Sequence, residues 1–257
     1  MISNVALAVA TLAGSASAWL KNLDINNLPP KADPGGYGYN RCGTKSSPDS
    51  KCQNVYIRSA EDFCLFAPHD LSGVSETERT AVAYCTKDGY GTRLIPSDTF
   101  ESVHFHYVQI TGRGNFSKIN VLQNDDGGEL GIYDLHGNPI SGVVIGQQNQ
   151  FERWVEFLLP TEFCFRACFP GENDWKYCNH IYDTMGCQWN IPGNYEAGFD
   201  ECQGEDVVHP MGEYVNADGT TTMWKQGTQP VPPPGLPGKI TSCRTYASSL
   251  PQSALLL

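Results

Sequence analysis

The chain has 257 residues, ten of them cysteine, and a formal net charge of -11 at pH 7 with an isoelectric point near 4.9. An acidic surface repels phosphate backbones and lacks the basic patch that binds anionic lipid, which argues against nucleic acid and membrane surfaces as partners. The length suits one domain or two small ones with a sizeable core.

The first 18 residues are predicted to be a secretory signal peptide, with a buried N-terminal helix as the alternative. They form an apolar, small-residue run without an acidic residue, which ends in the small-x-small pattern Ala16-Ser17-Ala18. The run is too short and too rich in Ala, Gly and Ser to be a permanent membrane span, which takes about 20 strongly apolar residues. A secreted chain with an even number of cysteines is expected to form disulfides.

After residues 1–18, three parts follow. Residues 19–41 are rich in Asn, Pro and Gly and are expected to form an extended arm. Residues 42–229 are expected to form a disulfide-rich β domain. Residues 230–257 begin with a polyproline-like segment and are expected to be a Pro-rich tail that Cys243 pins to the domain.

Short apolar bursts separated by turn formers predict strands in the first part of the domain. Cys42 and Cys52 lie ten residues apart around a Ser/Lys/Pro loop, a spacing that favours a local bridge. Cys64 and Cys85 lie in two neighbouring bursts and are expected to join two strands. Turn signals across residues 93–146 predict antiparallel hairpins.

Residues 151–159 are predicted to form a helix. Their apolar positions recur at i, i+3, i+4, i+7 and i+8, the pattern of one helical face, although aromatic residues favour a strand. A second helix is predicted after Asn173-Asp174, which offer an N-cap, with Gly186 as its C-cap.

Residues 163–202 are the segment around which the domain is organised. Phe163, Phe165, Ala167 and Phe169 alternate with two thiols and an arginine, which predicts a strand with one aromatic and one cysteine-bearing face. Because the segment holds an odd number of cysteines, at least one bridge must leave it if all ten pair within the chain. The pairing otherwise stays open for the cysteines expected in disulfides: Cys42, Cys52, Cys64, Cys85, Cys164, Cys168, Cys178, Cys187, Cys202 and Cys243.

No catalytic constellation stands out in the sequence. It contains no G-x-S-x-G nucleophile elbow, no P-loop and no G-x-G-x-x-G fingerprint. Glycoside hydrolysis would need two carboxyl groups about 5–9 Å apart. The acidic candidates are Asp125, Asp126, Glu129, Asp134, Glu152 and Glu156.

Two patterns suggest cation binding, each with a simpler alternative. His104 and His106 lie on one face of a predicted strand, which is either a weak metal-site pattern or a chance surface pair. The 124–129 loop, rich in Asp and Gly, is either a Ca²⁺ ligand set or a solvated turn. No cofactor is predicted from these patterns.

Trp175, Trp189 and Trp224 are candidates for glycan binding, because aromatic rings can form a platform for sugar rings. With Tyr182 and Tyr195, the alternative is core packing around the disulfides. Asn115-Phe116-Ser117 is a standard N-glycosylation sequon at a Gly-rich turn.

Seven strings across the chain carry a family resemblance. They run from DFCLFAP (62–68) and AYCTKDGYGTRLIP (83–96) through YVQITGRGNFSKIN (107–120), GGEL (127–130), GNPISG (137–142) and EFCFRAC (162–168) to CNHIYDTMGCQWNIPGNYEAG (178–198). From about Gly38 to Tyr214 the chain resembles fungal macrophage-activating glycoproteins, also called immunoreactive mannoproteins. The resemblance implies a secreted or cell-wall glycoprotein of a fungus and supplies no catalytic residue.

The sequence therefore predicts a mainly β (α+β) fold, a disulfide-rich antiparallel β domain with one or two short helices. We expect a secreted mannoprotein-like glycoprotein that is not an enzyme and acts at the cell wall or at a host interface, as an effector or an immunoreactive antigen. The expected partners are cell-wall polysaccharide or a host extracellular protein. The alternative is a carbohydrate-active protein, either a glycan-binding module or a glycoside hydrolase.

Overall fold

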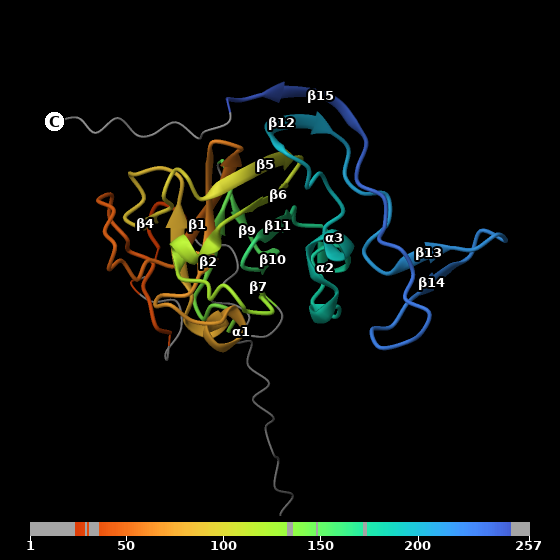
Figure 1. Ribbon diagram of the computed structural model, residues 1–257, viewed down its shortest axis with the longest axis horizontal. Coiled ribbons are helices and arrows are strands. Elements are labelled where there is room, and N and C mark those ends of the chain that lie inside the picture. The colour runs from red at the N-terminus through yellow and green to blue at the C-terminus, as the bar shows by residue number, and fades with distance from the viewer. Residues whose placement is uncertain are drawn as a thin grey trace, which may run out of the picture.

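Two large β-sheets pack face to face around the main core (Figure 1). The computed structural model describes residues 24–28, 30, 36–132, 136–147, 149–171 and 174–247. The predicted signal peptide and most of the predicted N-terminal arm lie outside these residues. The chain is mostly β with short helices and five disulfides, which confirms the predicted fold class.

The first sheet has six strands in the order β4-β3-β2-β1-β8-β9. Its strands are β1 (Asn54–Ser59), β2 (Asp62–Ala67), β3 (Val82–Cys85), β4 (Arg93–Leu94), β8 (Val143–Ile145) and β9 (Gln150–Phe151). Between β2 and β3 lie α1 (Val74–Thr77) and the 3-10 helix η2 (Glu78–Thr80). The predicted disulfide Cys64–Cys85 joins β2 to β3, and the predicted Cys42–Cys52 bridge closes the loop before β1.

The second sheet has seven strands in the order β15-β12-β5-β6-β11-β10-β7. Its strands are β5 (Phe100–His106), β6 (Gln109–Gly114), β7 (Gly128–Gly131), β10 (Arg153–Leu158), β11 (Glu162–Cys168), β12 (Gly198–Gly204) and β15 (Ile240–Thr245). The 3-10 helix η3 (Phe116–Ile119) follows β6.

Hairpins account for less of residues 93–146 than the turn signals predict. Within that range β5 and β6 form the expected antiparallel hairpin, whereas β4 pairs in parallel with β3 and β8 in parallel with β1. A third parallel pair joins β12 to β5. The partners in the β1–β8 and β5–β12 pairs are distant in sequence, so local turn residues could not indicate those two pairs.

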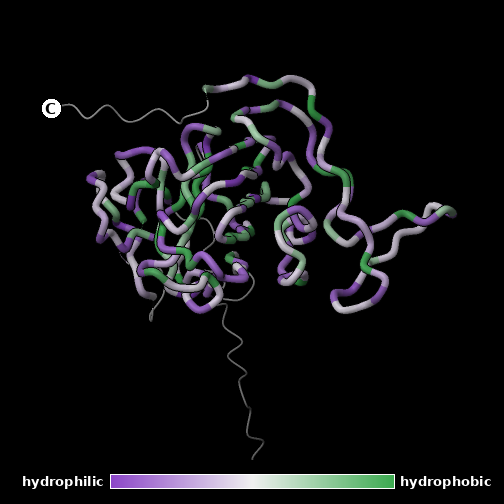
Figure 2. Tube along the Cα trace, in the orientation of Figure 1, coloured by the Kyte–Doolittle hydropathy of each residue, from purple (hydrophilic) through white to green (hydrophobic). Residues whose placement is uncertain are grey.

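The core between the sheets is built from their inward-facing side chains. Figure 2 shows hydrophobic positions interspersed with hydrophilic ones along the strands of both sheets. Phe63 and Phe66 from β2 contact rings of the opposite sheet: Phe63 stacks on Phe163 with centroids 5.9 Å apart, and Phe66 stacks on Trp154 at 5.0 Å. Such pairs add about 0.5–1.5 kcal/mol each to the stabilisation from burial.

The helix predicted for residues 151–159 is wrong, because these residues form β9 and β10. Strand β10 lies between β7 and β11. Trp154 and Leu158 belong to the main core on one face, and Val155 and Phe157 to a second cluster on the other. A strand buried on both faces reads as a nearly continuous apolar run, which periodicity does not distinguish from a buried helix.

Strand β11 has the two different faces that its sequence predicts. Phe163, Phe165 and Ala167 belong to the main core. On the other face Cys164 is bonded to Cys187 and Cys168 to Cys178, so two disulfides attach residues 174–190 to the outer surface of the sheet.

The predicted helix from residue 174 to Gly186 is replaced by shorter elements. The structure has α2 (Asp174–Tyr177), the 3-10 helix η4 (Asp183–Met185) and α3 (Gly186–Asn190), so Gly186 begins a helix instead of ending one; Asn173 lies outside the described residues. Tertiary contacts override the capping signals. His180 contacts Glu129 of β7, and the hydroxyl of Tyr182 donates a hydrogen bond to the Trp224 carbonyl oxygen at 2.6 Å.

Residues 205–239, here called the C-terminal arm, connect β12 to β15. They carry the hairpin β13 (Glu213–Val215) and β14 (Thr221–Met223), which projects from the side of the molecule in Figure 1. Cys202 and Cys243 lie opposite each other on β12 and β15 and are bonded, so one bridge does leave the 163–202 segment, as its odd cysteine count requires.

The two ends of the aromatic face of β11 give the first prediction. Replacing Phe163, which is fully buried, by Ala should cost about 3–5 kcal/mol, because it leaves a cavity between the sheets. Phe169 lies just beyond the strand and is 55% exposed, so Phe169→Ala should cost less than about 1 kcal/mol. Denaturant unfolding measures both, and equal losses would contradict this account of the core.

Candidate functional site

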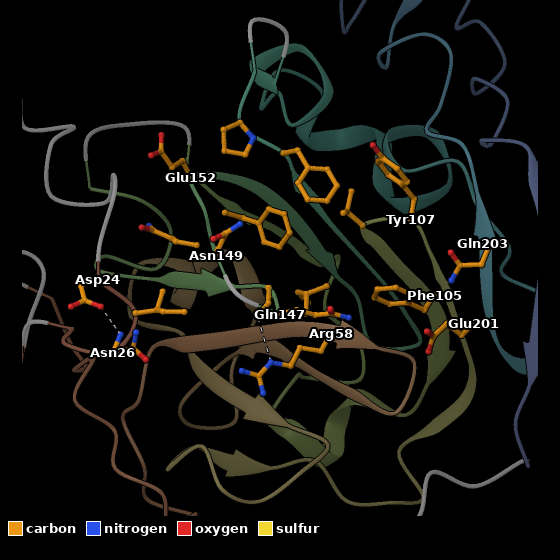
Figure 3. A pocket seen from close by; sticks show the side chains of 18 residues that line it. Asp24, Asn26, Arg58, Phe105, Tyr107, Gln147, Asn149, Glu152, Glu201 and Gln203 are labelled. Atoms are coloured by element: carbon orange, nitrogen blue, oxygen red, sulfur yellow. Dashed lines mark hydrogen bonds between the residues drawn. The ribbon is translucent and has the colours of Figure 1, made fainter.

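A cleft of about 950 Å³ opens beside the edge where the two sheets meet (Figure 3). The volume falls within the range of about 300–1,000 Å³ typical of ligand sites. Its walls are formed by strand β1, the β8–β9 turn, the β5–β6 turn, strand β12, residues 24–26 and the start of the segment after β11. Its lining residues are Asp24, Ile25, Asn26, Ile57, Arg58, Phe105, Tyr107, Val108, Gly146, Gln147, Asn149, Gln150, Phe151, Glu152, Phe169, Pro170, Glu201 and Gln203.

Three ring side chains, here called the aromatic row, line one side of the cleft. Phe151 lies 5.5 Å from Phe169, and Phe169 packs edge to face against Tyr107 at 5.7 Å between centroids. Phe151 is buried, whereas Phe169 and Tyr107 are 55% and 40% exposed. Exposed rings held in a row at a cavity provide an apolar surface for a ligand.

The backbone of Tyr107 is held in the left-handed region, with φ of 60°. Tyr107 and Val108 form the two-residue turn between β5 and β6, and glycine is preferred where the first turn residue has positive φ. A non-glycine residue in a sparsely populated region costs about 1–3 kcal/mol, and such strain is concentrated at functional sites. The exposed ring therefore occupies its place at a cost in stability.

The rest of the lining is rich in side-chain amides, from Asn26, Gln147, Asn149, Gln150 and Gln203. In Figure 3, Asp24, Asn26 and Glu152 lie on one side of the cavity, and Phe105, Glu201 and Gln203 on the opposite side. Amide groups donate and accept hydrogen bonds, so the lining matches a ligand with many hydroxyl or amide groups.

Arg58 is the basic residue among the described residues of the lining, and its guanidinium contacts side chains below the cleft. Its guanidinium donates to the Tyr90 hydroxyl at 2.7 Å and lies over the rings of Tyr56 and Tyr90. Tyr90 donates in turn to both carboxylate oxygens of Asp62, at 2.8 and 2.9 Å. Burial and Asp62 raise the pKa of Tyr90 to about 12, so Tyr90 stays a neutral donor.

The predicted histidine pair is buried in the seven-stranded sheet. His104 Nδ1 lies 3.0 Å from Asp200 Oδ1, and its Nε2 lies 2.9 Å from the Glu196 carbonyl oxygen. Burial lowers the pKa of His106, whose Nε2 packs so closely on Gly204 that a Cβ there would lie 2.4 Å away. Within the described ranges, no group of three His, Cys, Asp or Glu side chains is placed to bind a metal ion.

The structure separates the acidic candidates. Asp125 accepts backbone hydrogen bonds from Val74 and Gly127 and orders its own loop, whose Asp126 is exposed. Glu156 and Glu129 lie on neighbouring strands and point to opposite faces of the sheet, because Glu156 pairs with Leu130 in the register. Of the candidates, Glu152 lines the cleft and Asp134 lies outside the described residues.

The three tryptophans predicted as glycan-binding candidates, Trp175, Trp189 and Trp224, do not lie on one surface. Trp189 is buried in a cluster with Tyr182 and half-buried Trp224, with ring centroids 4.7–5.7 Å apart. This cluster holds the C-terminal arm against α3. Trp175 lies apart on α2 and is half exposed, and Tyr195 is buried against the outer face of the seven-stranded sheet.

Two curated proteins of the fungus Mycosarcoma maydis are similar to the chain along most of its length. Appressorium protein ROW2 is 42% identical over 260 residues, which cover 93% of this chain and 86% of ROW2. The chain belongs to this family of fungal appressorium proteins. Appressorium protein ROW1 is 44% identical over 237 residues, which cover 84% of this chain and 54% of ROW1. No family model and no solved structure matches the chain.

Membership of the ROW family supports the fungal assignment that the sequence resemblance implies. The disulfide-rich fold and the appressorium relatives are consistent with a secreted or cell-surface protein. No helix in the described part of the chain is long and apolar enough to cross a membrane. The assignment as a mannoprotein stays a prediction.

Sequence reasoning missed Tyr107, Phe169 and the amides of the cleft. The alternation of residues 103–107 predicts that Tyr107 continues the strand on the same face as Val103 and Phe105, whereas the strand ends at His106. The pattern that could have identified this turn is a two-residue break between two runs of alternating residues. Phe169 was grouped with the core-facing rings, and its position just before Pro170-Gly171 could have marked it as lying beyond the strand.

A buried carboxyl and imidazole pair lies away from the cleft, between β7 and η4. Glu129 Oε1 is 2.6 Å from His180 Nδ1, and a Cβ on Gly131 would lie 1.9 Å from the imidazole. Burial, and then a hydrogen bond to Asp183, raise the pKa of Glu129 to about 9. Burial lowers the pKa of His180 to about 4, so both groups are uncharged at neutral pH.

Glu129 should make the fold less stable as the pH rises. The folded state keeps this proton up to about pH 9, whereas the unfolded chain releases it near pH 4.5. Stability is therefore lost across that window, by at most about 1.4 kcal/mol per pH unit. Urea unfolding at pH 7 and pH 9 should show a smaller loss for Glu129→Gln than for the unmodified protein. Parallel losses would contradict a neutral Glu129.

Proposed function

We propose that the protein is a non-enzymatic binding protein of the fungal cell wall or host interface, and that the cleft binds an extracellular polysaccharide. The observation that carries the proposal is the aromatic row, with two exposed rings above a lining of side-chain amides. The C–H groups of a pyranose form an apolar face that packs on an aromatic ring, while its hydroxyls need the polar partners that amides supply.

The rigidity of the cleft walls supports a binding role. The Tyr107 turn lies at the tip of the β5–β6 hairpin, in the middle of the seven-stranded sheet, and β12 is held to β15 by Cys202–Cys243. A preformed surface loses little conformational freedom on binding, which favours affinity. Two relatives named for the appressorium support a place at the host interface, where an effector or an immunoreactive antigen acts.

The substitution Tyr107→Gly should weaken polysaccharide binding while it leaves the stability of the fold nearly unchanged. Glycine relieves the left-handed backbone, which offsets the lost contact with Phe169, so the unfolding free energy should change by no more than about 1 kcal/mol. Retention on insoluble chitin, β-glucan or mannan should fall by about tenfold, equivalent to about 1.4 kcal/mol. Tyr107→Phe keeps the ring and serves as the matched control, and equal retention by all three proteins would refute the proposal.

Hydrolysis is the second candidate, because Glu152 and Glu201 both line the cleft. A glycoside hydrolase needs two carboxyl groups across the scissile bond and releases soluble sugar. The same retention assay distinguishes the two functions when the supernatant is analysed by mass spectrometry. We expect the protein to be retained on the polysaccharide without releasing oligosaccharides. If oligosaccharides are released and Glu201→Gln abolishes this release, the cleft is a catalytic site and the binding proposal is wrong.

We also propose that Asn115 carries an N-linked glycan, as expected of a mannoprotein. Asn115 is exposed directly after β6, and its side-chain oxygen accepts hydrogen bonds from the Ser117 amide and hydroxyl, at 3.2 and 2.6 Å. In protein secreted from a fungal host, Asn115→Gln and Ser117→Ala should remove the same glycan mass, whereas Ser117→Thr should keep it. Unchanged intact masses after both removals would contradict an occupied site.

A further inference from the structure

A second pocket, of about 320 Å³, lies at the other edge of the six-stranded sheet from the cleft. It opens beside the edge strand β4, which Figure 1 shows at one side of the molecule, and is closed by residues 46–48 and by η3 with the residue after it. None of the described residues that line it is acidic, although the chain carries a net charge of -11. Two of them, Arg93 and Lys118, are basic.

The guanidinium of Arg93 is buried without a carboxylate partner. Arg93 is 9% exposed. Its Nε donates to the Ser50 carbonyl oxygen at 2.9 Å, and its Nη1 donates to the His69 carbonyl oxygen at 2.6 Å and to the Tyr84 hydroxyl at 2.9 Å. Among the described residues no carboxylate forms an ion pair with this guanidinium, and Nη2 donates no hydrogen bond. Burying a charge without a counter-charge is costly, so an anion bound here would be stabilised.

Tyr84 does not supply the missing negative charge. Burial raises the pKa of Tyr84 in spite of the nearby guanidinium, so its hydroxyl stays protonated and donates to the Pro68 carbonyl oxygen at 3.0 Å. The side-chain amide of Asn120 donates to the same hydroxyl at 2.8 Å. The phenol is therefore a neutral group whose hydrogen bonds are already formed, and it leaves the charge of Arg93 unbalanced.

The acidic residues around the pocket are exposed and have other partners. Asp98 forms an ion pair with Lys118, Asp88 accepts hydrogen bonds from two backbone amides, and Asp70 lies beside a neighbouring histidine. These three side chains and Asp49 are in contact with water, which screens them from a buried cation. Lys118 is thus largely neutralised by its partner, and the buried guanidinium supplies the positive charge of the pocket.

The remaining donors match a tetrahedral oxyanion better than a carboxylate. A carboxylate binds arginine best through two parallel N–H groups, but Nε and Nη1 of Arg93 are already occupied. Nη2 remains, with the hydroxyl of Ser47, which accepts a hydrogen bond from the Asp49 amide at 3.3 Å and keeps its own proton. Lys118 adds an N–H group that Asp98 does not use. The oxygens of a phosphate group can accept from donors on such separate elements.

We propose that this pocket binds a tetrahedral oxyanion, a phosphate or sulfate group, with Arg93 as its counter-charge. Nη2 of Arg93 and the hydroxyl of Ser47 donate to its oxygens, and Lys118 contributes from the rim of the pocket. The site is separate from the cleft and does not depend on the proposed polysaccharide binding.

A carboxylate placed in the pocket tests the proposal. Replacing Arg93 would also remove its three hydrogen bonds to the fold, so the test adds a charge instead. Ser47 is the suitable position, because it lines the pocket and its amide donates to the carbonyl oxygen of Thr92, next to Arg93, at 3.1 Å. Ser47→Asp keeps a side-chain acceptor for the Asp49 amide and adds a negative charge. Ser47→Asn keeps the acceptor without the charge and is the matched control.

Calorimetric titration of the folded, secreted proteins measures binding at constant ionic strength. The probes are sodium phosphate, sodium sulfate, glucose 6-phosphate and sodium acetate. Phosphate and sulfate should each bind the unmodified protein at least about fivefold more tightly than acetate. Ser47→Asp should weaken phosphate binding by about tenfold or more, and Ser47→Asn by less than about threefold.

Thermal unfolding gives a second readout. Phosphate that binds the folded state raises the unfolding temperature, and this rise should be smaller in Ser47→Asp than in Ser47→Asn. The general stabilisation of proteins by phosphate salts acts on both variants alike and cancels in the comparison. Circular dichroism verifies the fold of each variant.

The outcomes decide both the site and the source of its ligand. Tighter binding of glucose 6-phosphate than of inorganic phosphate supports the site and identifies a phosphate ester of a sugar as the ligand, whereas binding that is no tighter supports the site with the free ion. Acetate binding as tight as that of phosphate and sulfate overturns the proposal, because the pocket would then not select a tetrahedral group. Phosphate affinity that is the same in Ser47→Asp and Ser47→Asn, or absent from the unmodified protein, also overturns it.

Discussion

Strand β11 is covered on both faces, and the rest of the fold depends on how this is achieved. On one face Phe163 and Phe165 fill the space between the two sheets. On the other face Cys164 and Cys168 are bonded to residues of the loop and helices that cover the outer surface. One strand therefore joins three layers, by packing on one side and by covalent bonds on the other.

The sequence predicts the local part of this arrangement well. The alternation around Phe163 directly encodes which face is apolar, and a short loop between Cys42 and Cys52 restricts their choice of partner. Prediction from the sequence fails where the tertiary environment determines the secondary structure or the strand pairing. Strand β10 looks like a helix because its neighbours bury both of its faces, and the parallel pair of β1 and β8 joins segments that no turn connects.

The candidate site was harder to predict than the fold, for a related reason. Tryptophans were singled out by residue type, yet burial divides them: Trp189 packs inside, and Trp175 stands alone on α2. The cleft instead depends on Tyr107, Phe169 and amide side chains brought together by sheet pairing. No two of its walls are adjacent in the chain, so spacing along the sequence carried no information about them.

The bond between Cys202 and Cys243 has a further consequence for resistance to proteolysis. The C-terminal arm and its projecting hairpin form a covalent ring with β12 and β15. A protease that cuts this ring once opens the loop but releases no fragment, because the two new ends stay linked through the sulfur atoms. The exposed β13–β14 hairpin can thus be nicked while the cleft wall that carries Glu201 keeps its neighbouring strand.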